Sequence, residues 1–250
     1  MDQAECLKVA FITPEMAPLA KTGGLADVTG ALPKYLSRLG QLEVTVWLPF
    51  YREIKNKNLE LKTVASNLKL NVFPAEKTFS ILEYQAEGFK VYLIENDFYF
   101  GRDYLYGTPE GDYPDNGQRF AFFSLAVLTG FKVINWPPDL IHAHDWQAAL
   151  TLAYLKHSLA GDSFYQKTRS LFTIHNLAYQ GLFPPDILNQ AGLPGYLFNP
   201  EDLEFYGRVN FLKAGLLYSQ AISTVSPTYS REIQSAEFGF GLDGVLRKKI

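Results

Sequence analysis

The chain has 250 residues, of which 47% are hydrophobic and 20% are charged, and this composition excludes a disordered protein. Its 23 basic and 26 acidic residues are spread along the sequence and leave a formal net charge of -3. Because there is no basic stripe to replace the counterions of a phosphate backbone, we expect no nucleic acid partner.

The sequence favours a protein of a reducing, cytoplasmic compartment. Cys6 is the single cysteine, so an internal disulfide cannot form. The amino terminus lacks the basic patch and apolar core of a secretory signal. No apolar stretch approaches the roughly 20 residues that are needed to span a bilayer, so we expect no membrane partner.

The first fifth of the chain predicts a strand, a loop, a helix and a second strand. Lys8–Thr13 is a short apolar run typical of a buried strand, and Gly24–Leu39 has helical spacing. Pro33 lies inside that helix, so we expect a kink or two shorter helices there. Glu43–Leu48 predicts the second strand.

The segment from Leu68 to Ile94 changes to alternating, β-rich pieces with few helical signals. These pieces read LKLNVF, TFSILEY and FKVYLI. Alternation of this kind indicates a hairpin-like insertion at the edge of a sheet.

Strands and helices alternate again in the second half of the chain. The predicted elements are helix Asn116–Phe131, strand Leu140–Ala143, helix Gln147–Leu159, strand Ser170–Ile174, strand Ala221–Val225 and a helix that begins near Pro227. This order predicts an α/β fold with a doubly wound, Rossmann-like parallel sheet, whose sites lie at the carboxyl ends of the strands. Because we find no internal repeat or linker, we treat residues 1–250 as one domain.

A glycine turn, KTGGLAD (21–27), follows the first strand and opens the first helix. Gly23 and Gly24 allow backbone amides to face an anion, and Lys21 adds a positive charge, which favours a phosphate-bearing ligand. An equally good interpretation is a tight turn in which Asp27 caps the helix or points to solvent. The spacing matches neither the dinucleotide fingerprint nor a Walker loop, and we expect no cofactor.

The sequence HAHDW (142–146) places polar groups at the end of a predicted strand. His142 and His144 are two residues apart and therefore share a face of the strand. A metal-dependent hydrolase built on these histidines, Asp145 and His175 is one alternative function. Histidines that are hydrogen-bonded inside a sheet crevice are commoner, so we expect no metal.

A second strand ends in TIHNLAYQG (173–181). His175 and Asn176 would lie near His144 and Asp145 if the two strands are neighbours. Imidazole, carboxamide and carboxylate groups together suit a hydroxyl-rich ligand. For Asn176, a hydrogen-bonded turn is the alternative.

Aromatic residues cluster in a loop that also contains Arg102 and Asp103. They are Phe98, Tyr99, Phe100, Tyr104, Tyr106 and Tyr113. Such rings can stack on sugars or pack against the domain's own core, and the sequence leaves both interpretations open.

In combination, these segments resemble the glycogen and starch synthase family, glycosyltransferases with two Rossmann-like domains (GT-B) that use a nucleotide-activated glucose. The similar blocks are Lys21–Val28, preceded by Pro14–Met16 and followed by Gly30–Pro33, then His142–Trp146, Thr173–Gly181, Phe211–Gly215 and Thr224–Ile233. They stand in the family's order, and the resemblance extends from the first strand to Arg247.

The resemblance implies a set of site residues. Lys21, Gly23 and Gly24 would approach the diphosphate of ADP-glucose, while His175 and Asp145 would be catalytic, next to the transferred glucose. The other implied substrate-binding residues are Glu15, Asp27, Tyr106, His144, Trp146 and Asn176.

By the same resemblance, the reaction transfers glucose from ADP-glucose to the non-reducing end of an α-1,4-glucan with retention of configuration. No pair of carboxylates stands out as nucleophile and acid, so we do not expect a double displacement. A front-side route is expected, in which the departing diphosphate helps to take the acceptor's proton and His175 orients the glucose.

The resemblance also implies that residues 1–250 are the amino-terminal, acceptor-side domain and that the carboxy-terminal nucleotide-sugar domain is absent. The last residues, GLDGVLRKKI, show no closing cap or polar tail, as expected for a fragment. Because a cleft between two domains needs both walls, we expect little or no synthase activity from this chain alone. A non-catalytic glucan-binding module is a third alternative.

Overall fold

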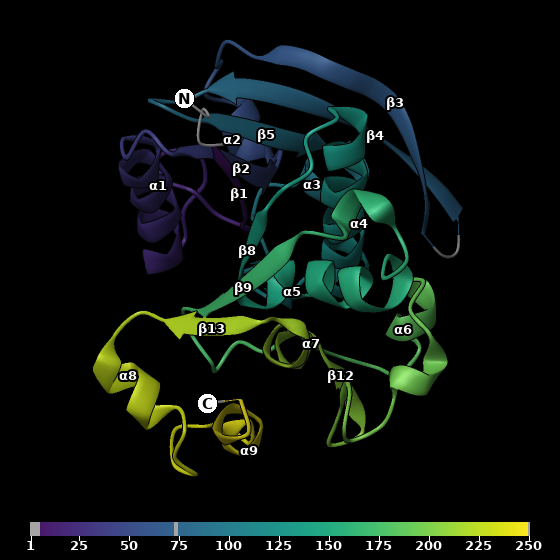
Figure 1. Cartoon of the computed structure of the whole chain (residues 1–250). Coiled ribbons are helices and arrows are strands. Elements are labelled where there is room, and N and C mark those ends of the chain that lie inside the picture. The colour runs from purple at the N-terminus through teal and green to yellow at the C-terminus, as the bar shows by residue number, and fades with distance from the viewer. Residues whose placement is uncertain (1–5, 73–74, 250) are drawn as a thin grey trace.

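The computed structural model describes residues 6–72 and 75–249, and its centre is an eight-stranded sheet (Figure 1). The strand order is β13-β9-β8-β1-β2-β5-β4-β3. Their bounds are β1 (Leu7–Ile12), β2 (Leu42–Pro49), β3 (Lys62–Val72), β4 (Ala75–Gln85), β5 (Lys90–Glu95), β8 (Leu140–His144), β9 (Arg169–Ile174) and β13 (Ala221–Thr224). Each pair of neighbours from β13 to β5 is parallel, which confirms the predicted doubly wound α/β class, whereas β4 pairs antiparallel with both β5 and β3.

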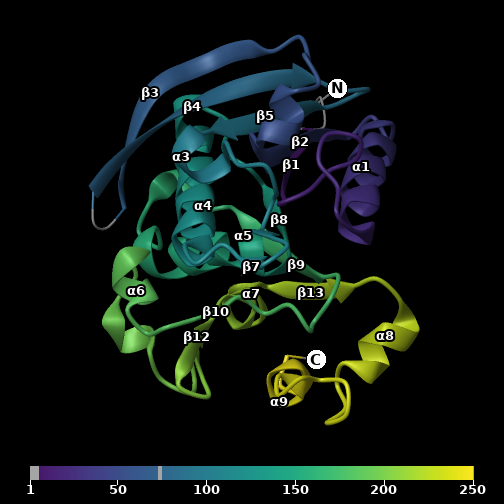
Figure 2. The same ribbon diagram turned by 180° about the vertical axis from the view of Figure 1, so that it is seen from behind.

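Helices cover the sheet on both faces (Figures 1 and 2). The α-helices are α1 (Gly24–Ser37), α2 (Arg52–Lys55), α3 (Asp97–Phe100), α4 (Asn116–Val133), α5 (Asp145–Ala153), α6 (Ile187–Gln190), α7 (Phe211–Tyr218), α8 (Pro227–Glu232) and α9 (Asp243–Arg247). Helix α5 continues as a π-helix over Tyr154–Ser158, and short 3₁₀ helices span Ser163–Tyr165 and Gly195–Leu197. Helices α4, α5 and α7 pack side by side, and α1 lies on the other side of the sheet.

Small strands complete the fold outside the central sheet. They are β6 (Gly107–Thr108), β7 (Gly111–Asp112), β10 (Leu182–Phe183), β11 (Glu204–Phe205) and β12 (Arg208–Asn210). Strands β10, β12 and β11 form a three-stranded sheet, and β6 pairs with β7. In the part of the chain that the structure describes, no helix has the length and apolar character needed to cross a membrane.

The β-rich segment differs in part from the prediction. Strands β3 and β4 form an antiparallel hairpin at the sheet edge, as expected, and Phe73 lies outside the described residues. However, the third predicted piece is β5, which pairs parallel to β2 and belongs to the central sheet. Four of its residues are buried, and a continuous apolar run cannot by itself tell a parallel strand from a hairpin strand.

Of the two outcomes predicted at Pro33, the division of α1 into two shorter helices is wrong, and a kink stays a prediction. The helix runs without interruption from Gly24 to Ser37, and Pro33 is one of its buried residues. Burial of this face against β2 supplies packing that offsets the missing backbone hydrogen bond. The predicted helix from Gln147 begins two residues earlier, because Asp145 turns the chain directly from β8 into α5.

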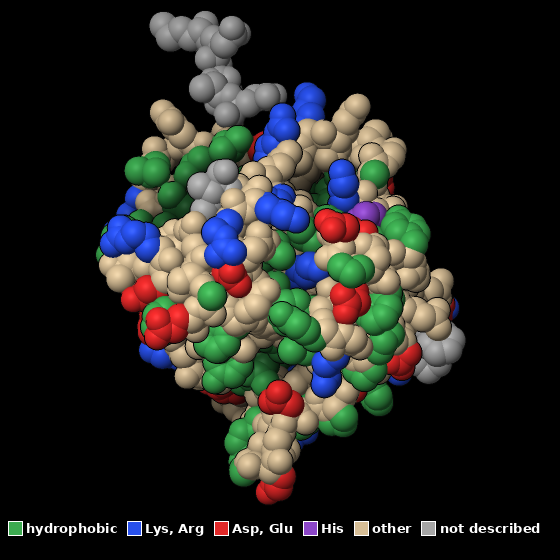
Figure 3. All heavy atoms as spheres, turned by 90° about the horizontal axis from the view of Figure 1, so that it is seen from below, with side chains coloured by type: hydrophobic (Ala, Val, Ile, Leu, Met, Phe, Trp, Pro, Cys, Tyr) green, Lys and Arg blue, Asp and Glu red, His purple; other side chains and the backbone are tan. Residues whose placement is uncertain are grey.

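Charges of both signs are mixed on the surface seen from below. Lysine and arginine side chains lie among acidic and hydrophobic ones over this face, and neither sign gathers in one continuous patch (Figure 3).

Gly215 of α7 allows close approach of that helix to β9. A methyl group at this position would lie within 2.6 Å of three ring atoms of Phe172, which is fully buried. We therefore predict that Gly215→Ala lowers the free energy of unfolding by about 1–3 kcal/mol, the usual cost of overpacking a core. Urea denaturation of this variant and of wild type measures the difference.

Gly244 of α9 provides the matched control, because an added methyl group would meet nothing within 4 Å. Gly244→Ala should be neutral or stabilising, since alanine is the better helix former. Equal stability of Gly215→Ala and Gly244→Ala would contradict the packing argument.

Candidate active site

A cleft of about 720 Å³ lies at the carboxyl ends of four neighbouring parallel strands. Glu15 follows β1, Asp145 follows β8, His175 follows β9 and Val225 follows β13, and all four line the cleft. The other lining residues are Thr22, Gly23, Gly24, Leu25, Val28, Tyr106, Asp112, Asn116, Trp146, Gln147, Asn176 and Tyr179. The strand order therefore brings together the glycine turn and the two polar strand ends that the sequence singled out.

Glu15 holds the glycine turn from below. Its side chain is buried, and Oε2 accepts hydrogen bonds from the backbone amides of Thr22 at 2.5 Å and Gly23 at 3.2 Å. Oε1 accepts from the Thr22 hydroxyl and from the Tyr106 hydroxyl, both at 2.6 Å. The glycines predicted an anion facing the backbone amides of the turn. In this structure that anion is the side-chain carboxylate of Glu15.

Lys21 and Asp27 pair with each other at the rim. The Lys21 ammonium lies 2.6 Å from the Asp27 carboxylate, and both side chains are at least half exposed. Neither residue is among those that line the cleft. An exposed pair of this kind contributes little to stability, so Lys21 can leave Asp27 for a ligand at small cost.

Asp145 occupies an unusual backbone position. Its φ of 55° lies in the left-handed region, and its buried carboxylate accepts a 2.7 Å hydrogen bond from the His175 amide. Burial raises the pKa of this carboxyl to about 7, while the amides of His175 and Asn176 act in the opposite direction. Strained backbone with a buried acid concentrates at functional sites.

The ring of His175 contacts the ring of a second histidine, His144. Its Nε2 lies 2.9 Å from Nδ1 of His144, so the face that can meet a ligand is the Nδ1 side of the ring. His144 is fully buried, stacks on Phe11 with ring centroids 5.5 Å apart, and does not line the cleft. Burial lowers the pKa of His175 to about 4 and holds the pKa of His144 well below its usual value. Both imidazoles are therefore neutral at pH 7, and His144 supports His175 from beneath.

Because three imidazole side chains are buried, we predict that the fold loses stability in acid. Burial also lowers the pKa of His142 to about 3, so His142, His144 and His175 stay neutral in the fold while unfolded histidines take up protons below pH 6.5. Their stabilising contribution is present above pH 6.5 and is lost on acidification. The raised pKa of Asp145 acts in the opposite sense between about pH 7 and 4, but one carboxyl opposes three imidazoles. We expect a net loss of stability between pH 7 and pH 4.5.

Urea denaturation at these two pH values measures that loss. His142→Asn should lose less stability than wild type on acidification, since the substituted group does not titrate. His157→Asn is the comparison variant, because His157 lies partly exposed next to Tyr196 and burial lowers its pKa without the large shift of His142, so its replacement should recover less stability. A stability that rises on acidification would contradict the assignment.

The histidines do not converge as metal ligands. His142 directs Nε2 to the Thr173 hydroxyl at 2.6 Å, and Thr173 in turn meets Ser223 at 2.6 Å. Within residues 6–72 and 75–249, no group of three or more His, Cys, Asp and Glu side chains could hold a metal ion. The geometry therefore gives no support to the metal-dependent hydrolase.

Aromatic residues form the apolar wall of the cleft. Trp146 is 8% exposed and packs edge-on against Phe120, with ring centroids 5.0 Å apart. Tyr106 directs its hydroxyl into the site, whereas Phe98 and Tyr104, from the same aromatic stretch, are exposed. Residues of this aromatic stretch therefore lie in three places: in the core, on the surface and in the cleft.

Several lining residues were not singled out from the sequence. Thr22 and Tyr179 lie inside the two blocks that were, and Tyr179 is 68% exposed at the rim. Asn116 begins α4 after a loop, where a polar residue is so common that the sequence carries no signal of a site, and Gln147 is a polar residue in the first turn of α5. Asp112 belongs to β7, which only the tertiary structure brings to the cleft.

The chain matches known proteins over nearly its whole length. Residues 8–248 match the family model described as "Starch synthase catalytic domain". The chain belongs to this family. "Glycogen synthase 2" of Geobacter metallireducens is 50% identical over 244 residues, which cover 97% of this chain and 50% of that protein. "Glycogen synthase 2" of Geobacter sulfurreducens is 47% identical with the same coverage.

A solved structure of the starch synthase family has the same fold. It is the "Catalytic domain of Starch Synthase IV from Arabidopsis thaliana bound to ADP and acarbose", with a TM-score of 0.85 and 30% sequence identity. The match covers 98% of this chain and 50% of that chain. The chain thus spans about half the length of the curated relatives it matches, and the GT-B class expected from the resemblance is confirmed.

Proposed function

We propose that this chain is the amino-terminal, acceptor-side half of a glycogen or starch synthase. The complete enzyme would transfer glucose from ADP-glucose to the non-reducing end of an α-1,4-glucan with retention of configuration. The observation that carries this proposal is a cleft that brings the glycine turn, Asp145 and His175 together, in a chain that belongs to the starch synthase family. The ADP and acarbose bound by the Arabidopsis relative support a nucleotide sugar and a glucan as the two substrates.

The glycine turn would meet the donor's diphosphate. Because Glu15 already occupies the amides of Thr22 and Gly23, the phosphate would use the amides at the start of α1, from Gly24 onward. Lys21 would exchange Asp27 for the phosphate. Both contributions stabilise the negative charge that grows on the departing diphosphate.

The ends of β8 and β9 would hold the transferred glucose. His175 and Asn176 offer neutral hydrogen-bonding groups for sugar hydroxyls, and Trp146 offers a ring for one sugar face. The ionised Asp145 carboxylate would lie near the positive charge that develops on the sugar ring. Glu15 accepts four hydrogen bonds from the protein and so is not free to act as a nucleophile, which favours the front-side route in which the leaving diphosphate takes the acceptor's proton.

A titration with maltoheptaose tests the proposed glucan side. The chain has three tryptophans, and Trp146 is the one that lines the cleft. We expect a saturable change in tryptophan fluorescence that disappears in Trp146→Phe and persists in Trp136→Phe. A flat response of wild type, measured together with intact folding by circular dichroism, would count against the acceptor-side assignment.

In this proposal, activity requires the carboxy-terminal domain, which would form the second wall of the cleft. We expect no measurable transfer by residues 1–250 alone, and transfer from ADP-glucose once the chain is joined to the carboxy-terminal half of the Geobacter metallireducens relative. A folded fusion that binds both substrates and remains inactive would favour a glucan-binding module without catalysis. The cytoplasmic location stays a prediction.

A further inference from the structure

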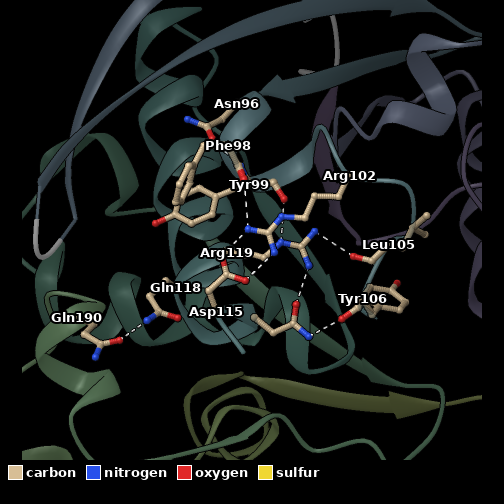
Figure 4. A network of polar contacts seen from close by, with 11 residues as sticks. Asn96, Phe98, Tyr99, Arg102, Leu105, Tyr106, Asp115, Gln118, Arg119 and Gln190 are labelled. Atoms are coloured by element: carbon tan, nitrogen blue, oxygen red, sulfur yellow. Dashed lines mark hydrogen bonds and ion pairs between the residues drawn. The ribbon is translucent and has the colours of Figure 1, made fainter. Parts of the chain in front are cut away.

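Arg119 is a fully buried cation without a carboxylate partner among the residues that the structure describes. It lies in the second turn of α4, and Figure 4 shows its guanidinium at the centre of a network of carbonyl oxygens. Nε donates to the Tyr99 carbonyl at 2.8 Å and Nη2 to the Leu105 carbonyl at 3.0 Å. Nη1 donates to the Asn116 side-chain oxygen at 2.6 Å.

Aromatic rings surround this charge in place of an anion. The guanidinium carbon lies 4.9 Å from the ring centre of Tyr113 and 5.4 Å from that of Phe120. The nearby carboxylate of Asp115 is bonded to Arg102 at 2.7 Å. Burying an unpaired cation is costly, and cation–π contacts with carbonyl hydrogen bonds offset only part of that cost. If the side chain at position 119 only had to fill space in the core, an apolar side chain of similar volume would stabilise the fold at least as well.

The network leads from Arg119 to the glycine turn through three links. Asn116, fixed by Arg119, donates from Nδ2 to the Tyr106 carbonyl at 2.8 Å. The Leu105 carbonyl, also fixed by Arg119, immediately precedes Tyr106 (Figure 4). The Tyr106 hydroxyl then meets Glu15, whose carboxylate holds the amides of Thr22 and Gly23.

We propose that Arg119 is a positioning residue of the cleft. By fixing both sides of the Tyr106 backbone, it holds the Tyr106 hydroxyl on Glu15 and so keeps the glycine turn in its ligand-ready form. The identity of the ligand, a nucleotide diphosphate, rests on the function proposed above. The chain of contacts from Arg119 to the glycine turn is independent of that function. Lysine cannot replace arginine here, because one ammonium cannot reach three acceptors that a planar fork spans.

Amide hydrogen exchange in the ligand-free chain tests the link directly. In Arg119→Lys, we expect the Thr22 and Gly23 amides to exchange at least about tenfold faster than in wild type, because Glu15 is released from Tyr106. Amides of Phe11 and Ile141, in the central strands, should keep their wild-type rates. Arg52→Met is the matched control, since Arg52 contacts the outer side of the same segment through Gly101 and Asp103.

Two further variants keep the test decisive if Arg119→Lys folds poorly. Asn116→Ala removes one of the two links from Arg119 to Tyr106 and keeps the one through the Leu105 carbonyl, so the turn amides should exchange faster than in wild type but more slowly than in Arg119→Lys. Tyr106→Phe should have the same effect, and adding Arg119→Lys to it should bring no further increase at the turn. Wild-type exchange at Thr22 and Gly23 in Asn116→Ala, or equal acceleration of turn and strand amides in Arg119→Lys, would overturn the proposal.

Binding of ADP provides the second measurement. In the chain joined to the carboxy-terminal half of the Geobacter metallireducens relative, we expect about tenfold weaker ADP binding in Arg119→Lys than in Arg52→Met, with similar melting temperatures of the two variants. If wild type binds no ADP while the exchange results hold, the proposed ligand is wrong and the positioning role stands. If wild type and Arg119→Lys bind ADP equally, the positioning role is wrong.

Discussion

His175→Ala, introduced into the chain joined to a carboxy-terminal half of its family, should lower turnover about 10²- to 10³-fold, the usual effect of removing one group that contacts the reacting centre. The structure holds this ring in one orientation, because Nε2 is tied to His144 and the backbone amide is tied to Asp145. Its pKa of about 4 keeps it neutral, and in the proposed function it orients the glucose by hydrogen bonding. Initial rates of glucose transfer from ADP-glucose to maltoheptaose measure the effect.

His157→Ala is the matched control for this result. His157 lies in the π-helix that follows α5, where it contacts Tyr196 and Tyr218 and does not line the cleft. Its removal should leave turnover within about twofold of wild type, as expected for a substitution away from the reacting groups. Near-normal turnover of His175→Ala would remove this residue from the mechanism.

Asp145→Asn should lower turnover about 10²-fold or more and abolish a pH dependence that wild type shows near neutrality. Burial raises the pKa of the Asp145 carboxyl to about 7, so this group is largely protonated below pH 7 and ionised above it. If the ionised form stabilises positive charge on the sugar ring, the wild-type rate rises as the pH increases through 7. Asparagine tolerates the left-handed backbone at this position, so the change isolates the charge.

Rates between pH 5.5 and 8.5 distinguish the two protonation states of Asp145. Asp103→Asn is the control, because Asp103 is exposed and pairs with Arg52 outside the cleft. This variant should keep both the rate and the pH profile of wild type. A wild-type rate that falls as the pH rises through 7 would mean that Asp145 acts in its protonated form.

The stability of the fold and the proposed role of His175 both depend on the buried, neutral pair of His144 and His175. Both imidazoles are kept neutral by burial, which is also the source of the predicted acid lability. A site that operates with neutral imidazoles at pH 7 therefore loses part of its folding free energy in acid. The same buried environment raises the pKa of Asp145, so one region of the core determines the protonation of all three groups.

The sequence by itself determined the fold class and the principal site segments. Alternation of apolar strands with helical spacing is a local property, and the polar residues at 142–146 and 173–181 stand directly after strands. Asp145 and His175 were expected close together if their strands are neighbours; β8 and β9 are paired, and the Asp145 carboxylate accepts a 2.7 Å hydrogen bond from the His175 amide. The glycine turn was found because it lies between β1 and α1.

Only the tertiary structure decided what these segments contact. Local spacing does not reveal that Glu15 turns back onto the amides of the glycine turn, or that Arg119 holds Tyr106 from a position 13 residues further along the chain. It also could not assign β5 to the parallel sheet or place His144 beneath His175, because strand order and burial depend on contacts between residues far apart in sequence. The principal segments of this site could each be recognised from a short stretch of sequence. The charge states and hydrogen-bond partners of its residues could not, because these depend on burial and on packing between distant parts of the chain.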